Sequence, residues 1–262
     1  MPDLRTITVN GEDSPSATGG EGPDLLWLHG EGNTSGWREV HDRLAERFTV
    51  HAPTLPGFGG TPLPEWLDDM DDLALWTADA CVALGLEHPV VVGESLGGWL
   101  ALTSAIWRPA LPVALVLVGP LGLRPAEPAP DLFIKAAPEA LGYLSERIDA
   151  AAVDPMTGDI DAATALWVEQ ATQARLMWER PYDRRLERRL HHVSCPRCVV
   201  WGAVDRLLPV EHGARLAAAL GAAPPTVVAG AGHLVSIDDP VAVADATTAL
   251  ATTAGVLDGG NR

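Results

Sequence analysis

The sequence predicts an α/β fold in which helices cover both faces of a mostly parallel sheet. Two observations lead to this class: short, almost wholly apolar runs recur along the chain, and helical patterns separate them. Parallel strands that are buried on both faces have this nearly continuous apolar character. The runs lie at 25–28, 48–50, 90–92, 113–118, 199–201 and 226–228.

Helical patterns fill the intervals between these runs. In the stretch 65–85, apolar side chains recur at three- and four-residue steps, and the pattern stops at Gly85, a residue type favoured just after a helix. Further helices are expected directly after Ser95 and at 37–47, 209–220 and 239–251.

One long interval contains no buried-strand pattern. From Leu121 to Val193 the chain shows prolines followed by helical patterns, and this length is too great for a loop inside a compact domain. We therefore expect residues 121–190 to form a helical cap over the ends of the strands. The core is expected from the segments 1–120 and 191–262.

The composition disfavours several classes of partner. The chain has 262 residues, with 18 basic and 35 acidic side chains and a formal net charge of −17. Such a protein is repelled by nucleic-acid phosphates and anionic bilayers, so neither partner is expected. The N-terminus lacks a signal-peptide pattern, and three cysteines do not make a disulfide framework. We expect a cytoplasmic monomer or homodimer that acts on a small molecule.

The segment Gly93-Glu94-Ser95-Leu96-Gly97 lies where an apolar run passes into an apolar helical pattern. Gly-x-Ser-x-Gly between a strand and a helix is the signature of a nucleophile elbow, in which the serine occupies a strained turn and the glycines permit close backbone approach. The motif alone occurs often by chance, and the flanking strand and helix give it weight. Ser95 is therefore the candidate nucleophile.

A serine hydroxyl needs a base and an orienting carboxylate to act as a nucleophile at neutral pH. Asp205 follows the run 199–201, and His233 follows the run 226–228. Taken alone, the aspartate reads as a turn residue or helix cap and the histidine as a loop residue. Three such residues at three strand ends favour a triad, in which His233 takes the proton of Ser95 and Asp205 fixes the imidazole tautomer.

Stabilising an oxyanion requires two backbone N–H groups that point at one place. Leu96, directly after the candidate nucleophile, supplies one N–H at the start of a helix. The other is expected from the turn that begins at His29-Gly30, most directly from the Glu31 N–H and next from the Gly32 N–H. The alternative for this segment is an ordinary turn at the end of a strand.

These motifs resemble those of the α/β-hydrolase superfamily, and more narrowly its capped esterase, lactonase and C–C hydrolase branch. The chain order Ser95, Asp205, His233 matches the order of the triad residues in that fold. The segment 55–61 looks like the loop that follows the fourth strand in the family. The resemblance covers essentially the whole chain.

The resemblance implies an eight-stranded, mostly parallel sheet with the helical cap inserted after the sixth strand. It also implies an acyl-enzyme on Ser95, formed without a metal or a cofactor. Haloalkane dehalogenases and epoxide hydrolases of this superfamily carry aspartate at the nucleophile position, whereas serine suits acyl chemistry. Those two activities are therefore not expected.

The expected function is hydrolysis of a carboxylic ester or lactone of a small or medium apolar substrate. Hydrolysis of a C–C bond in a vinylogous keto acid is an alternative. The six arginines between Arg175 and Arg189 are expected to be solvated or paired with acidic side chains that bind the cap to the core, and the alternative, attraction of a substrate carboxylate, would favour C–C hydrolysis. Leu234 disfavours it because that branch tends to place an arginine and an aromatic side chain near the histidine. A third interpretation is a hydrolase-like protein that binds a ligand without turnover.

Several other features are expected to be structural. Cys195 and Cys198 follow two histidines and have the residue types of a metal or redox site, but Cys198 should enter a buried strand. Glu94 is expected to be buried or hydrogen-bonded near the elbow. Trp167 and Trp178 are expected to fill the core of the cap, and the alternative is that they line the roof of the pocket.

Overall fold

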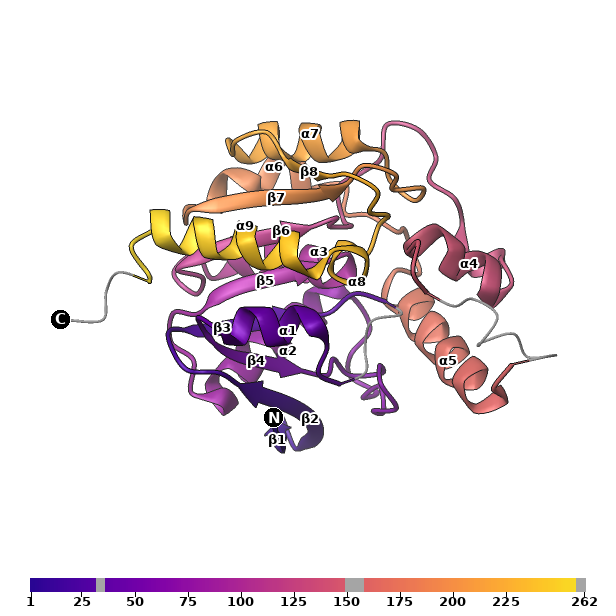
Figure 1. Cartoon of the computed structure of the whole chain (residues 1–262). Helices are drawn as coiled ribbons and strands as arrows, with labels where there is room; N and C mark the ends of the chain where they lie inside the picture. Colours follow the sequence, from indigo (N-terminus) through magenta and orange to yellow (C-terminus); the bar gives the residue numbers. More distant parts are fainter. Residues whose placement is uncertain (32–35, 149–157, 258–262) are drawn as a thin grey trace.

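The computed structural model describes residues 1–31, 36–148 and 158–257, and its centre is an eight-stranded sheet flanked by helices (Figure 1). The strand order is β1-β2-β4-β3-β5-β6-β7-β8. β2 pairs antiparallel with β1 and β4, and every other pair is parallel. The strands are β1 (Asp3–Val9), β2 (Glu12–Gly19), β3 (Asp24–Leu28), β4 (Thr49–Pro53), β5 (Val90–Glu94), β6 (Ala114–Val118), β7 (Arg197–Gly202) and β8 (Thr226–Val228).

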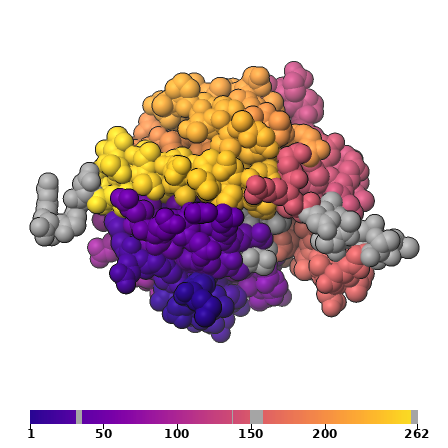
Figure 2. All heavy atoms as spheres, in the orientation of Figure 1, coloured from indigo at the N-terminus to yellow at the C-terminus, as the bar shows by residue number. Residues whose placement is uncertain are grey.

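Helices cover both faces of the sheet. α1 (Glu39–Ala45) and α9 (Pro240–Thr253) pack together on one face, and Figure 2 shows the yellow α9 region against the purple α1 region. α2 (Met70–Leu84), α3 (Leu96–Trp107) and α7 (Val210–Leu220) cover the other face. Within the described ranges, no helix is long and apolar enough to cross a membrane.

The central strands are buried on both sides. Leu26 and Leu28 join the hydrophobic cluster under α2, α3 and α7, whereas Leu25 and Trp27 join the cluster under α1 and α9. This split follows from the alternation of side chains along a strand. It explains the nearly continuous apolar runs and confirms the predicted fold class.

The helix that we expected at 65–85 begins later than predicted. The Asp69 side chain accepts hydrogen bonds from the Asp71 and Asp72 N–H groups, so α2 starts at Met70. An aspartate that satisfies otherwise unpaired N–H groups in this way is a strong helix start. The predicted start at residue 65 is therefore wrong, although the end at Gly85 is correct.

We call the chain between β6 and β7 (residues 119–196) the β6–β7 insertion. In its described part, the secondary-structure elements are helices. Thr172 Oγ1 of α5 donates to the Gly57 carbonyl at 2.9 Å, and the Leu234 N–H donates to the Leu144 carbonyl at 2.7 Å. Gly57 follows β4 and Leu234 follows β8, so the insertion lies at the carboxyl ends of the strands (Figure 1). Its elements are η1 (Leu132–Ile134), α4 (Ala137–Leu144), α5 (Ile160–Leu176), α6 (Leu186–Arg189) and η3 (Leu190–His192).

Two tryptophans of the insertion lie at its surface. The exposed fraction is 67% for Trp167 and 85% for Trp178. The expectation that they fill a core is wrong, because the apolar face that α5 buries is formed by other residues, including Ala163 and Leu176.

Candidate active site

Ser95 occupies the sharp turn between β5 and α3. Its backbone angles are φ 52° and ψ −114°, a conformation that non-glycine residues rarely adopt. The surrounding chain holds this turn in place: the Ser95 N–H donates to the Val118 carbonyl at 2.9 Å, and the Ser95 carbonyl accepts from the Leu121 N–H at 3.0 Å. The turn thus places Ser95 at the end of the strand ladder and at the start of α3, where its carbonyl also accepts the Trp99 N–H at 3.1 Å.

Glycines allow the backbones around this turn to approach one another. A Cβ on Gly93 would lie 2.4 Å from the Gly97 carbonyl oxygen, and a Cβ on Gly97 would lie 2.1 Å from the Leu28 carbonyl oxygen. Both obstacles are backbone atoms, which cannot rotate away. The two glycines of the motif are therefore required for α3 to pack against β5 and β3.

Substitution Gly97→Ala is expected to destabilise the fold by about 3 kcal/mol, because overpacking a rigid backbone contact costs roughly 1–3 kcal/mol or somewhat more. Urea unfolding measures the change in the free energy of unfolding. Gly142→Ala in α4 is the matched control, since a Cβ there meets nothing within 4 Å. The control should gain about 0.5–1 kcal/mol because alanine is the better helix former. Equal stability of Gly97→Ala and wild type would contradict the steric argument.

The structure brings Ser95, His233 and Asp205 into one hydrogen-bonded chain. The Ser95 Oγ lies 2.7 Å from His233 Nε2, and His233 Nδ1 lies 2.8 Å from Asp205 Oδ2. These residues follow β5, β8 and β7, whose carboxyl ends meet at one edge of the sheet. Ser95 and His233 are completely buried, with exposed fractions of 0%.

The Asp205 carboxylate is held by its own loop. Its Oδ1 accepts the N–H groups of Leu207 and Leu208 at 2.8 and 2.9 Å, which leaves Oδ2 for His233. With Oδ2 accepting, the proton on the imidazole belongs on Nδ1. His233 Nε2 is then free to accept a proton from the Ser95 hydroxyl.

His29 orders the turn that follows β3. Its Nε2 accepts the Leu55 N–H at 3.0 Å, and its Nδ1 donates to the Gly30 carbonyl at 3.0 Å. Burial lowers the pKa of His29 to about 4, so the ring is neutral and this pair of bonds is maintained at neutral pH. The sequence motif located this turn but assigned no role to the histidine itself.

Two N–H groups, those of Leu96 and Glu31, are predicted to form an oxyanion hole, and Gly32, the second choice after Glu31, lies outside the described residues. Leu96 is the first residue of α3, so its N–H has no acceptor within the helix. Gly30 packs directly against the nucleophile, since a Cβ on it would lie 2.9 Å from the Ser95 Cβ. Glu31 comes next and is buried, with an exposed fraction of 6%. The oxyanion role of Leu96 and Glu31 stays a prediction.

Charge around His233 favours its protonated form. Burial lowers its pKa, but the Asp205 carboxylate, through its charge and its hydrogen bond, outweighs burial, and Glu31 and Glu94 add to the same effect. The pKa of His233 therefore lies above 6.5, its ordinary value. In the described part of the chain, neither carboxylate oxygen of Glu31 has a hydrogen-bond partner.

Substitution Glu31→Gln is expected to lower the pKa of His233, because it removes one negative charge that stabilises the imidazolium. An NMR titration of the imidazole resonances should place the wild-type pKa above 6.5 and the variant pKa below the wild-type value. Glu139→Gln, which removes an exposed charge paired with Lys135, should leave the titration unchanged. An unchanged or higher pKa in Glu31→Gln would contradict this account.

Glu94, the residue before the candidate nucleophile, is buried as expected. Its carboxylate accepts the N–H of Ser236 at 2.8 Å and also the Ser236 hydroxyl. Ser236 lies three residues after His233 in α8 (Val235–Asp238), so this contact connects the elbow to the histidine loop.

The arginine-rich end of the insertion lines a hollow of about 1040 Å³ next to Trp99 of α3. Several of its arginines face acidic side chains, as in the pair Arg175–Asp68 at 2.8 Å. Among the described residues that line this hollow, Ser95 does not appear. The basic side chains of the lining are Arg124, Arg175, Arg180, Arg184, Arg185 and Arg188, and the acidic ones are Asp68, Asp69, Asp71, Glu179 and Asp183.

The pair Cys195 and Cys198 lies at the start of β7. Cys195 is buried and Cys198 is half-buried, and burial raises the pKa of the Cys198 thiol to about 11. Both thiols are free, and Cys198 is thus protonated at neutral pH. The described residues contain no group of three or more His, Cys, Asp or Glu side chains arranged to hold a metal ion.

The family assignment agrees with this geometry. A model of the alpha/beta hydrolase family matches residues 25–246, which is most of the chain and includes all three residues of the Ser95–His233–Asp205 chain. The protein belongs to the alpha/beta hydrolase family. Members of this family are generally hydrolytic enzymes.

Its relatives span more than one kind of hydrolase. The chain is 30% identical to an uncharacterised protein of Mycobacterium tuberculosis over 93% of this chain and 80% of that protein. It is 26% identical to a 2-hydroxy-6-oxo-6-(2'-aminophenyl)hexa-2,4-dienoic acid hydrolase of Metapseudomonas resinovorans over 93% of this chain and 89% of that protein. A pimeloyl-[acyl-carrier protein] methyl ester esterase of Aeromonas hydrophila is 37% identical over 38% of each chain.

The fold has close structural counterparts. A bacterial membrane phospholipase A superposes with a TM-score of 0.83 at 22% identity, covering 97% of this chain and 86% of that chain. At this identity, the likeness concerns the fold.

Proposed function

We propose that this protein is a serine hydrolase that cleaves a carboxylic ester or lactone of a small or medium apolar substrate. The observation that carries the proposal is the hydrogen-bonded chain from Ser95 Oγ to His233 Nε2 at 2.7 Å and from His233 Nδ1 to Asp205 at 2.8 Å. This arrangement contains a nucleophile, a base and an orienting carboxylate in contact, which is what acyl transfer requires.

In the proposed reaction, Ser95 Oγ attacks the carbonyl carbon and its proton passes to His233 Nε2. The oxyanion is held by the N–H groups of Glu31 and Leu96. The C–O bond to the leaving alcohol then breaks, and the alcohol takes the proton from His233. Water attacks the acyl-enzyme with His233 as base, and the carboxylic acid leaves as Ser95 regains its proton.

We also propose that residues 121–190 act as a cap over this site. Three observations support the cap: Ser95 has no exposed surface, α5 contacts the Gly57–Gly59 loop, and the end of α4 contacts Leu234. With a net charge of −17, a cytoplasmic protein acting on a small molecule, without a nucleic-acid or membrane partner, is the proposed setting.

Hydrolysis of a C–C bond in a vinylogous keto acid is the second candidate. The dienoic acid hydrolase of Metapseudomonas resinovorans favours it, because the likeness extends over 93% of this chain. Serine and histidine would act in both reactions. The two candidates differ in the bond that is cleaved and in the need to hold a substrate carboxylate.

The test combines a covalent probe with two substrate types. A fluorophosphonate should label the wild-type protein on the peptide that contains Ser95. A series of short p-nitrophenyl esters should be turned over much faster than a coloured ring-fission dienoate. Faster turnover of the dienoate would replace the ester proposal by the C–C candidate. Absence of both labelling and turnover would refute the serine mechanism and favour the third interpretation, a protein that binds a ligand without turnover.

A further inference from the structure

The end of helix α4 touches the loop that carries His233. The backbone contact is the Leu234 N–H, which donates to the carbonyl of Leu144, the last residue of α4, at 2.7 Å. Leu234 directly follows His233, so the insertion and the candidate base are one residue apart at this contact.

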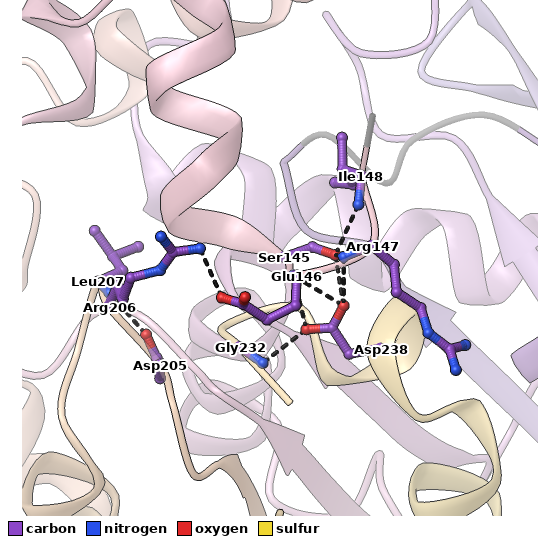
Figure 3. Close-up of polar contacts among 9 residues, drawn as sticks. All are labelled: Ser145, Glu146, Arg147, Ile148, Asp205, Arg206, Leu207, Gly232 and Asp238. Carbon is purple, nitrogen blue, oxygen red and sulfur yellow. Dashed lines mark hydrogen bonds and ion pairs between the residues drawn. The ribbon is translucent and has the colours of Figure 1, made fainter. Parts of the chain in front are cut away.

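One buried carboxylate strengthens this junction from both sides (Figure 3). Asp238, the last residue of α8, accepts on Oδ1 from the Ser145 hydroxyl at 2.6 Å and from the N–H groups of Glu146 and Arg147 at 3.1 and 3.2 Å. Its Oδ2 accepts from the Gly232 N–H at 2.7 Å. A single side chain thus binds the chain that leaves α4 and the residue that precedes His233.

The junction is closely packed as well as hydrogen-bonded. Asp238 and Ser145 are buried, with exposed fractions of 7% and 4%. A Cβ on Gly232 would lie 3.2 Å from Asp238 Oδ2 and 3.4 Å from the Leu144 carbonyl oxygen, which leaves little room for movement. Hydrogen bonds to a buried carboxylate are among the stronger ones, and removing the acceptor leaves several buried donors unpaired.

A second link joins the same end of α4 to the loop of Asp205. Arg206 donates to the Glu146 carboxylate at 2.6 Å (Figure 3). Their side chains are 53% and 43% exposed, and an exposed ion pair contributes little. The buried Asp238 network is therefore the stronger of the two connections.

We infer that Asp238 is a positioning residue that couples the end of α4 to the His233 loop, so that the place of the β6–β7 insertion sets the alignment of His233 with Ser95. The inference rests on the proposed role of His233 as the base. A substrate held under the insertion and the base that acts on it are linked through this carboxylate. Because a misplacement of about 1 Å costs about 100-fold in rate, a small shift of the loop has a large effect.

The test measures kcat per active site, counted by fluorophosphonate labelling of folded protein. Asp238→Ala is expected to lower kcat for p-nitrophenyl acetate about 10- to 100-fold while KM changes less than about two-fold, because alignment and not binding is lost. Asp238→Asn keeps the acceptor for Ser145 and should fall between this variant and wild type. Ser145→Ala should also lower kcat, and the double variant should lose no more than Asp238→Ala alone, because both act through one network.

Asp239→Ala is the matched control. The neighbouring Asp239 caps α9 by accepting the Ala242 N–H at 3.0 Å, so its removal destabilises the fold without touching the His233 loop. Its kcat per labelled site should equal that of wild type. If Asp238→Ala behaves like this control, or if the losses of Asp238→Ala and Ser145→Ala multiply, the inference is wrong.

Hydrogen–deuterium exchange separates this inference from the proposed function. Ser145→Ala should speed exchange in the peptide 229–239, which lies more than 80 residues away along the chain. Unchanged exchange there would overturn the coupling, whatever the activity. The wild-type protein could fail to hydrolyse esters and to react with the probe while Ser145→Ala still speeds exchange in this peptide. That result would refute the hydrolase proposal but support the coupling between α4 and the His233 loop.

Discussion

Substitution Ser95→Ala is expected to lower kcat for short p-nitrophenyl esters on the order of 10⁶-fold, the scale seen when a triad nucleophile is removed. The hydroxyl is the only group that can form the acyl-enzyme in the proposed reaction, and the His233 base has no proton to take without it. Release of p-nitrophenolate measures the rate. Circular dichroism and thermal unfolding should show a folded protein, because alanine fits the space that serine occupies.

Ser104→Ala provides the control for this variant. Ser104 is a buried serine on the same helix, and its hydroxyl has no hydrogen-bond partner among the described residues. Its removal should leave the rate within about two-fold of wild type, as expected for a substitution away from the site. Equal rates for wild type and Ser95→Ala would mean that another group carries the reaction.

Substitution Asp205→Asn is expected to lower kcat at neutral pH about 10⁴-fold. The Leu207 and Leu208 N–H groups need an acceptor, so the amide oxygen of asparagine should turn toward them. The amide NH₂ then faces His233 Nδ1 as a donor. The imidazole must carry its proton on Nε2, where it can no longer accept the proton of Ser95.

The pH dependence of kcat/KM tests this tautomer argument. In wild type, the rate rises with pH through the pKa of His233, which lies above 6.5 because of Asp205. In Asp205→Asn, this pKa should fall, so the acid limb of the profile moves to lower pH while the plateau falls steeply. A loss of less than ten-fold in the plateau would show that Asp205 does not control the tautomer.

Most of the elements that could be predicted from the sequence were predicted from short local patterns. The central strands are predictable because both of their faces are buried, and the elbow because strand, glycines and helix adjoin in the chain. The site follows from the same logic, since Ser95, Asp205 and His233 each stand just beyond an apolar run. Their mutual distances required the three-dimensional structure.

The N-terminal hairpin of β1 and β2 was not predicted, for a physical reason. β1 is exposed at most of its positions, so it shows no apolar run. The signal was in the turn: Asn10 and Gly11 have φ angles of 53° and 85°, and an Asn-Gly pair is the typical sequence of a two-residue hairpin turn. The Asn10-Gly11 turn is therefore the feature of the sequence that indicates the two strands.

Outside the Ser95–His233–Asp205 chain, the long-range polar contacts could not be predicted. Asp238 and Ser145 are 93 residues apart, and neither lies in a sequence pattern that indicates which residue it contacts. The exposed Trp178 is a similar case, because helical spacing indicates a face but not which face another element covers. Such features depend on how the β6–β7 insertion packs against the core.

The complete burial of Ser95 has a consequence for kinetics. In the proposed reaction an ester reaches this hydroxyl only once the protein opens, so we expect an opening step before bond cleavage. Motions of this kind take microseconds to milliseconds and limit the rate of many enzymes. When gating is slower than acylation, esters whose leaving groups differ widely in pKa are consumed at nearly one rate. A flat dependence of kcat/KM on leaving-group pKa would therefore report the opening of the protein, because deacylation does not enter kcat/KM.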